Sequence, residues 1–192
     1  MIGKKILVIF GISIIAFVLT TAGAFAFRPG SILQLKNLKK CNNCDLSGAD
    51  LTGLDLSEAE LQGANMSGAN FATTNLSGTN LANADLTGAK LSNVNLRGAN
   101  LSNANMTGAS LIKANLSGAD LTDANLTNAK LTDARLTDAN LTNANLTGAR
   151  MSSASLRGAI LTNTRLTGAR MDNASWLDGT TCKEGSVGEC RQ

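Results

Sequence analysis

Aromatic residues are nearly missing from this sequence: they make up 3% of 192 residues, with one tryptophan, no tyrosine and no histidine. Four of the five phenylalanines lie within the first 27 residues, so only Phe71 and Trp176 remain for the rest of the chain. A conventional globular core needs more bulk than this. We therefore expect a core of leucine and alanine in a regular stack.

The N-terminal segment has the pattern of a secretion signal. Lys4 and Lys5 are followed by the uncharged run Ile6–Phe27, and Ala24-Phe25-Ala26 supplies the small residues of a cleavage site. Residues 1–26 are therefore predicted to be a signal peptide. The alternative is a retained membrane anchor, since the 22 uncharged residues can just span a bilayer. Membrane contact is expected only in that case.

The balance of charge implies neither a nucleic-acid-binding protein nor an acidic mimic of DNA. Without Lys4 and Lys5 the chain carries 15 basic and 14 acidic residues, a net charge of +1. A nucleic-acid-binding protein is expected to be more basic, and an acidic mimic of DNA more acidic.

From residue 44 onward the sequence follows a five-residue period without an insertion. The central position of each repeat is a large apolar residue, counted every five residues from Leu46 to Trp176, which makes 27 repeats. A small residue, most often alanine, lies two positions before it, and aspartate or asparagine lies directly before it. Serine or threonine follows, and then glycine, asparagine or aspartate.

A period of five matches neither a helix nor a simple strand. If the chain turns a corner in every repeat, 20 residues form one square coil, and coils stack about 4.8 Å apart. The repeats then form six to seven coils, a rod roughly 30 Å long. Glycine dominates two of the four corner columns, which predicts type II turns there, because that turn needs a positive φ at its third residue.

The strings "ADLTG", "ANLSGADL" and "ANLTNAKL" resemble the pentapeptide-repeat family, and the resemblance covers residues 44–176. It implies an all-β fold, a right-handed quadrilateral β-helix with the central leucine and the preceding alanine pointing inward. Five inward positions depart from alanine and are expected to widen or polarise the core locally: Leu54, Thr74, Thr79, Val94 and Thr164.

Both ends of the repeat region are predicted to be capped. Ser31 is expected to cap a short helix, Ile32–Lys40, that covers the first coil. Its inner face would carry Ile32, Leu35 and Leu38, and Lys36, Lys39 and Lys40 would point to water. At the far end, Trp176 is expected to plug the core beneath a polar tail. The predicted regions are residues 1–26, an N-terminal cap at 27–43, the solenoid at 44–178 and a disulfide-linked tail at 179–192.

Four cysteines flank the repeats, two at each end. The ends lie roughly 30 Å apart by coil counting, whereas a disulfide needs Cα atoms within about 7 Å. The predicted pairs are therefore Cys41–Cys44 and Cys182–Cys190, which an exported protein would oxidise. The strings "CNNCDLSGADL" and "WLDGTTCKEGSVGEC" resemble exported family members of cyanobacteria and thylakoids. The predicted location is the periplasm or the thylakoid lumen, or a membrane anchor facing the same compartment.

No catalytic or cofactor site is predicted. A redox or zinc function of Cys41 and Cys44 is the alternative to a structural disulfide, but no thioredoxin-like scaffold is visible, and the other two cysteines are too far away to complete a zinc site. The acidic side chains lie at outward positions, where no cleft would perturb them. We therefore expect that the protein is not an enzyme and binds no metal or cofactor.

Two outward columns stand out, because residues 20 apart share a face. One consists of serine and threonine throughout, from Ser47 to Thr167. We interpret these side chains as turn-forming residues rather than as an ice-binding surface. The other is basic: Lys90, Lys130, Arg150 and Arg170. From the sequence alone a solvated face is the favoured interpretation of this basic column, and a docking strip for an acidic partner or a lipid surface is the alternative.

The resulting hypothesis is an extracytoplasmic structural or interaction module that presents rigid faces to an unknown protein partner. The alternative is the role of some family members that bind DNA gyrase as DNA mimics and confer quinolone resistance, which the export signal and near-neutral charge disfavour. No nucleic-acid binding is expected, and the two capped ends predict a monomer.

Overall fold

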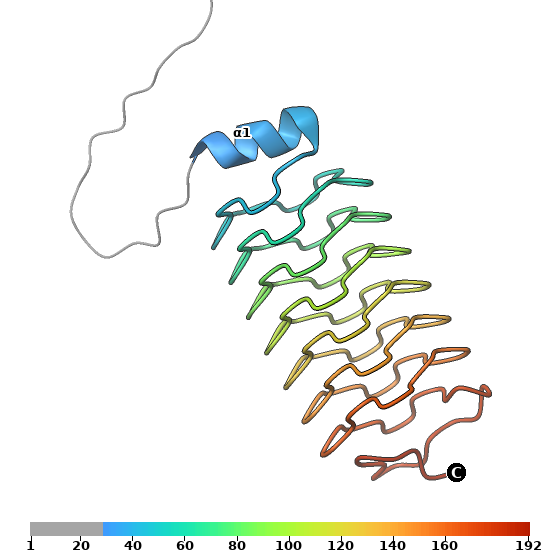
Figure 1. Ribbon diagram of the computed structural model, residues 1–192. Helices are drawn as coiled ribbons and strands as arrows, with labels where there is room; N and C mark the ends of the chain where they lie inside the picture. Colours follow the sequence, from blue (N-terminus) through green and yellow to red (C-terminus); the bar gives the residue numbers. More distant parts are fainter. Residues whose placement is uncertain (1–28) are drawn as a thin grey trace, which may run out of the picture.

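The computed structural model describes residues 29–192, so the predicted signal peptide, residues 1–26, lies outside the described residues. The chain forms a stack of square coils with helix α1, Pro29–Leu38, across one end and the C-terminus at the other (Figure 1). Parallel bridges join residues 20 positions apart along the stack, from Lys40 with Glu60 to Ser155 with Ser175. Each coil therefore has four sides of five residues.

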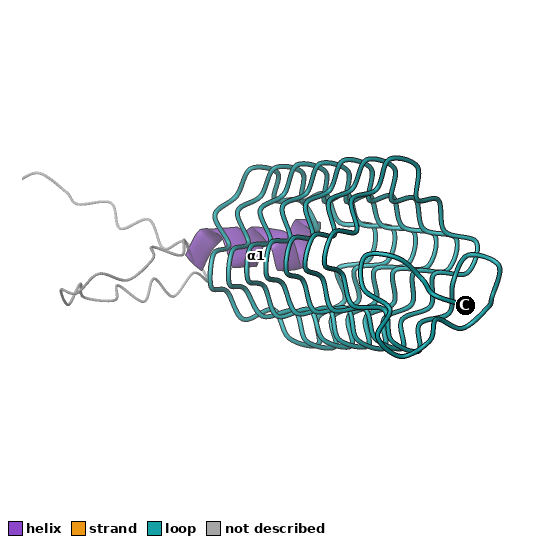
Figure 2. Cartoon of the chain, turned by 90° about the horizontal axis from the view of Figure 1, so that it is seen from below, coloured by secondary structure: helices purple, strands orange, loops and turns teal. Residues whose placement is uncertain are grey.

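Pairing between coils is made of isolated bridges, and no continuous strand is assigned within residues 29–192 (Figure 2). On one side, Leu96 N donates to Asn115 O at 2.7 Å and Asn115 N donates to Val94 O at 2.9 Å. The corner that follows every fifth residue leaves too few extended residues for a longer ladder. The β-helix is thus built from single-residue pairings repeated at each level.

Every corner contains a tight turn with a left-handed residue in third place. At one corner Ala109 N donates to Met106 O at 3.0 Å, and Gly108 has φ of 67°. The same sign of φ occurs in all four corner columns, even at Thr73, where φ is 59°. The positive φ predicted for the two glycine columns is therefore not confined to them. Asparagine and aspartate fill most of the remaining corners, because they tolerate this conformation better than other side chains.

Leucine and alanine fill the axis as expected. The central residues from Leu46 to Leu156 are at most 1% exposed. Where threonine replaces alanine, the hydroxyl finds an acceptor in the preceding coil, as when Thr79 donates to Leu56 O at 2.9 Å. Where a larger apolar residue replaces alanine, the turn opens, and Leu54 N lies 3.4 Å from Leu51 O. Both expected effects on the inner column are thus present.

Helix α1 differs from its prediction at both ends. It begins at Pro29, not after Ser31, so Ser31 lies inside the helix and is not its N-cap. Proline suits this first position because the amide hydrogen it lacks has no partner there. The helix ends at Leu38, two residues early, because Lys39 adopts φ of 52° and turns the chain into the first coil.

The contacts of α1 correct two further expectations. Leu35 is fully buried and Ile32 packs against the core, but Leu38 is 64% exposed and does not belong to the inner face. It is the last residue of the helix and points about 60° away from Leu35 around its axis. The two lysines that follow are held by partners: Lys39 Nζ donates to Ser57 O at 3.1 Å, and Lys40 pairs with Glu60 at 2.8 Å. They fasten the helix to the first coils.

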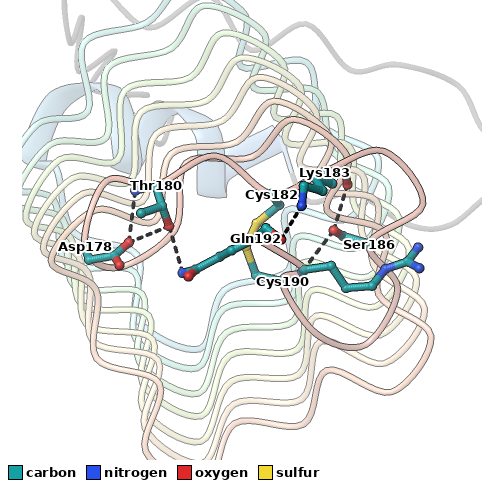
Figure 3. The surroundings of a disulfide bond; sticks show 8 residues. Asp178, Thr180, Cys182, Lys183, Ser186, Cys190 and Gln192 are labelled. Atoms are coloured by element: carbon teal, nitrogen blue, oxygen red, sulfur yellow. Dashed lines mark hydrogen bonds between the residues drawn. A yellow bond between two sulfur atoms is a disulfide. The ribbon is translucent and has the colours of Figure 1, made fainter.

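The C-terminal tail folds back over the last coil (Figure 3). Antiparallel bridges join Arg170 with Val187 and Ser175 with Thr181. Trp176 is partly buried against the core, and its amide donates to Thr180 O of the tail at 2.7 Å. Lys183 Nζ donates to the main-chain oxygen of Gln192 at 2.6 Å, which holds the last residue against the rest of the tail.

Candidate functional site

The residue directly before each central leucine lies in the middle of a side and normally shapes the next turn. Asp120 is typical: its Oδ1 accepts the amide of Thr122 at 3.0 Å and the hydroxyl of Thr122 at 2.6 Å. This arrangement is an Asx turn. Asn140, one coil later, also donates Nδ2 to the hydroxyl of Thr122 at 2.9 Å. Mid-side aspartate and asparagine therefore hold both the turn and the stack.

The hydroxyl column takes part in the same network. The hydroxyl of Thr127 donates to Oδ1 of Asn125 at 2.6 Å and accepts a hydrogen bond from Nδ2 of Asn145 at 3.0 Å. Its polar capacity is used within the solenoid. The contacts support the structural interpretation of this column.

The basic column occupies the mid-side position on one face, and all four of its members are exposed: Lys90, Lys130, Arg150 and Arg170. Bridges connect them in sequence through Ser110. Earlier in the same column, Asp50 and Asn70 form Asx turns with the amides of residues 52 and 72. Lysine and arginine have no acceptor atom and cannot form that turn. The basic column therefore replaces a stabilising local interaction with positive charge.

Little opposite charge offsets this column. Lys130, Arg150 and Arg170 lie on consecutive coils, about 4.8 Å apart along the axis. Among residues 29–192, its one ion pair joins Arg170 to Asp172 at 3.9 Å, on a largely exposed arginine. The result is a face of like charges on a rigid scaffold.

The two corners that border the basic column differ in charge and in side-chain size. Exposed Lys113 lies at one bordering corner, three residues after Ser110, and extends the positive charge across the gap in the column. Lys113 does not stand out in the sequence, because it is not in register with the 20-residue column. Asp133 lies at the same corner one coil later. The other bordering corner is formed mostly by glycines, as at Gly88 and Gly108, where no heavy atom lies within 4 Å of an added Cβ.

All four cysteines are in disulfides. The sulfur atoms of Cys41 and Cys44 are 2.05 Å apart, and those of Cys182 and Cys190 are 2.08 Å apart. In this state neither pair offers the thiolate that a redox centre or a zinc site requires. Within the described part of the chain, no three acidic or cysteine side chains are grouped closely enough to hold a metal ion.

The acidic side chains with a perturbed pKa have a lowered pKa, which does not favour acid–base catalysis. Hydrogen bonds from the hydroxyl groups and amides of Thr52 and Ser57 hold the pKa values of Asp50 and Asp55 below the ordinary value of 3.8. Thr180 lowers the pKa of Asp178 in the same way. A general acid near neutral pH needs the opposite shift. These groups act as ionised acceptors in turns.

Comparison with known proteins places this geometry in context. The family model described as pentapeptide repeats matches eight copies over residues 40–78, 64–103, 99–138 and 134–173. No curated protein sequence matches the chain. No helix within residues 29–192 is long and apolar enough to cross a membrane.

Several solved structures are similar to this chain. A pentapeptide repeat protein from the cyanobacterium Cyanothece 51142 is 28% identical, covers 77% of this chain and 97% of its own, and has a TM-score of 0.47. QnrB1, a plasmid-mediated fluoroquinolone resistance protein, is 23% identical over 78% of this chain and 77% of its own, with a TM-score of 0.40. A pentapeptide repeat protein from the Arabidopsis thaliana thylakoid lumen is 28% identical over 73% and 85%, with a TM-score of 0.23.

Proposed function

Because the chain belongs to the pentapeptide-repeat family, whose members fold as right-handed quadrilateral β-helices, we propose that it is a non-enzymatic interaction module that binds an acidic protein partner through its basic column. The module is a solenoid of six to seven coils, capped by α1. It presents rigid, flat faces and works outside the cytoplasm.

The observation that carries this proposal is the loss of the Asx turn in the basic column. The same column begins with Asp50 and Asn70, which form the turn, and continues with lysine and arginine, which cannot. Stacked like charges add a further cost. Positions where a local stabilising rule is broken with little compensation within the fold are expected at functional sites, and here the compensation is one long ion pair of Arg170 with Asp172. This reverses the interpretation that the sequence alone favoured.

The rigidity of the solenoid supports a docking role. The mid-side residues of successive coils are held by backbone bridges, so their spacing is fixed before a partner binds. Little ordering of the scaffold is then needed at binding. A partner with acidic side chains spaced along an extended face would match the basic column.

The sequence and the disulfides together support a compartment outside the cytoplasm. We propose that residues 1–26 are a cleaved signal peptide and that residues 27–43, 44–178 and 179–192 form the cap, solenoid and tail of the mature protein. Two disulfides fit an oxidising compartment, the periplasm or the thylakoid lumen. Retention of the N-terminal segment would place the same module on a membrane facing that compartment. The basic column does not favour the gyrase-binding alternative, because a mimic of DNA needs a surface of the opposite sign.

Crosslinking in the native compartment tests the proposal. Cells would express the wild type, an Arg150→Glu/Arg170→Glu variant, and a control variant, Arg135→Glu/Arg157→Glu. The control changes two exposed arginines on a neighbouring face by the same net charge. We expect the first variant to lose a crosslinked protein that the wild type and the control retain. Equal crosslinking by all three proteins, or binding to anionic vesicles with no protein partner, would refute it.

A further inference from the structure

The cations of the basic column are held at a regular interval along the solenoid. Lys130, Arg150 and Arg170 lie on consecutive coils, and Lys90 precedes them with Ser110 in the coil between. Each coil adds about 4.8 Å, so the column from Lys90 to Arg170 extends over about 19 Å. The coils stack along one straight axis (Figure 1), so the basic column is a straight row of charges.

This row is open to a partner along its whole length, because its cations are exposed. Among the residues that the structure describes, Lys90, Lys130 and Arg150 form no ion pair, and Arg170 contacts Asp172 at 3.9 Å. The backbone at each cation is fixed by bridges on both sides. The interval between the charges is therefore set in the free protein, and a partner has to match it.

An extended strand does not match this interval. Side chains on one face of a strand are two residues apart, which separates them by about 6.6–6.8 Å. The strand therefore gains about 2 Å on the basic column at each step, or about 8 Å over the four steps from Lys90 to Arg170. Acidic side chains on a strand could meet one or two of the cations but not the whole row.

An α-helix matches the interval much better. One turn of a helix rises 5.4 Å, about 0.6 Å more than one coil of the solenoid. Over four steps the difference is about 2.4 Å, and it is shared among several long side chains. Lysine has a flexible four-carbon stem and arginine a similarly long one, so their charged ends can follow a difference of this size.

The edge-to-edge spacing of a second β-sheet also matches, since neighbouring strands lie about 4.7–4.9 Å apart. Such a partner would need acidic residues directly opposite each other on successive strands. Like charges in that position destabilise a sheet, and the corresponding cost on a helix is smaller. The spacing and the charge together therefore favour a helix.

We propose that the partner presents an α-helix along the basic column, parallel to the solenoid axis, with one acidic residue in each turn facing the column. This inference rests on the function proposed above and names the kind of partner. Acidic residues at i, i+4, i+7, i+11 and i+14 form such a stripe on a helix. The turn that faces Ser110 needs no acidic residue, because the column has no charge there.

Fluorescence anisotropy with three labelled peptides of about 20 residues tests the proposal; a helix of that length spans the column. The striped peptide is alanine-rich and has one glutamate in each turn on a single face. The scattered peptide has the same composition, but its glutamates are distributed around the helix. The alternating peptide has the same number of glutamates at every second position among threonines. We expect the striped peptide to bind at least about tenfold more tightly than the other two.

Variants of the full mature chain show whether the basic column is responsible. Arg150→Glu/Arg170→Glu should weaken binding of the striped peptide at least about tenfold, whereas Arg135→Glu/Arg157→Glu, with the same net charge, should change it by less than about twofold. Ser110→Lys completes the row and should tighten binding about three- to fivefold when the striped peptide has a glutamate in every turn. Circular dichroism of the two alanine-rich peptides checks that they are equally helical.

The outcomes separate this inference from the function on which it rests. If the alternating or scattered peptide binds as tightly as the striped one, and the reversal of Arg150 and Arg170 abolishes that binding, the helical partner is wrong and the basic column is still a docking surface. If no peptide binds, or if the reversal leaves binding unchanged, both proposals are wrong. A Ser110→Lys variant that binds the striped peptide no better than the wild type also overturns the match in spacing.

Discussion

Arg150 and Arg170 occupy equivalent mid-side positions on consecutive coils and form a parallel bridge with each other. At the start of the same column, Asp50 and Asn70 occupy this position and shape the following turn. The pair therefore has two costs for stability, the lost Asx turn and the repulsion of like charges.

Replacing both arginines with asparagine should stabilise the fold. We expect Arg150→Asn/Arg170→Asn to raise the free energy of unfolding by about 0.5–1 kcal/mol per site, because each asparagine restores a turn and removes a repulsive contact. The electrostatic part of the gain should shrink as salt is added. Thermal unfolding at low and high ionic strength measures both effects. Arg157→Asn, at a corner, is the control and should show no such gain.

The left-handed corner at Thr73 is a site of backbone strain. A β-branched residue at φ of 59° is an outlier, and Oγ1 of Thr73 bonds only to the carbonyl of Ala72, at 2.6 Å. Thr73→Gly should stabilise the protein by about 1 kcal/mol. Thr132→Gly, at a corner position without positive φ, should destabilise it by about 0.5–1 kcal/mol. Chemical denaturation of both variants measures the difference, and a loss of stability in both would contradict the assigned turn geometry.

Acid should weaken the turns that contain aspartate. The pKa values of Asp50, Asp55 and Asp178 are lowered in the folded protein by hydrogen bonds from hydroxyl groups and amides. Their contribution is fully present above about pH 4 and is lost as pH falls through the lower folded values. Melting temperatures measured from pH 6 down to pH 2 should therefore fall most steeply below pH 4.

Asparagine provides the matched comparison for this pH dependence. Asn75 accepts the amide of Ser77 at 3.2 Å and its hydroxyl at 2.9 Å, as Asp55 does with Ser57 one coil earlier. Changing Asp50, Asp55 and Asp178 to asparagine should keep the turns and flatten the decline in acid. An unchanged decline in this triple variant would show that other groups cause it.

The Cys182–Cys190 disulfide should protect the last coil. Met171 N, Asn173 N and Trp176 N donate to tail carbonyl groups at 2.9, 3.0 and 2.7 Å. Cys182→Ser/Cys190→Ser should cost about 2–3 kcal/mol, as expected from its short loop, and should speed exchange at these three amides. Cys41→Ser/Cys44→Ser removes the disulfide that closes a shorter loop at the other end, and it should leave these three amides protected. Equal exchange in both variants would mean that the tail is held without its disulfide.

The interior of the solenoid was predictable from sequence because one local rule repeats. The same five-residue pattern places Leu96 and Leu116 on the axis and Asn95 and Asn115 outside, so a single assignment of register determines the whole stack. The basic column followed from the same register.

The ends were less predictable because no period governs them. The exposure of Leu38, the ion pair of Lys40 with Glu60 and the partial cover over Leu166 depend on contacts between segments that occur once in the chain. Helix α1 was located approximately, but its first residue was set by Pro29 rather than by Ser31. The sequence also does not show that the basic column lowers stability. The loss of the Asx turn at Arg150 becomes apparent only when the structure shows that Asp50 and Asn70 form this turn in the same column.

The proposal that the basic column is kept for binding is tested most directly by measuring stability and partner capture on one variant. Arg150→Asn/Arg170→Asn would be compared with wild type for its melting temperature and for the amount of protein crosslinked to it in its native compartment. We expect the melting temperature to rise while crosslinking through the basic column falls. Undiminished crosslinking in the more stable protein would contradict it.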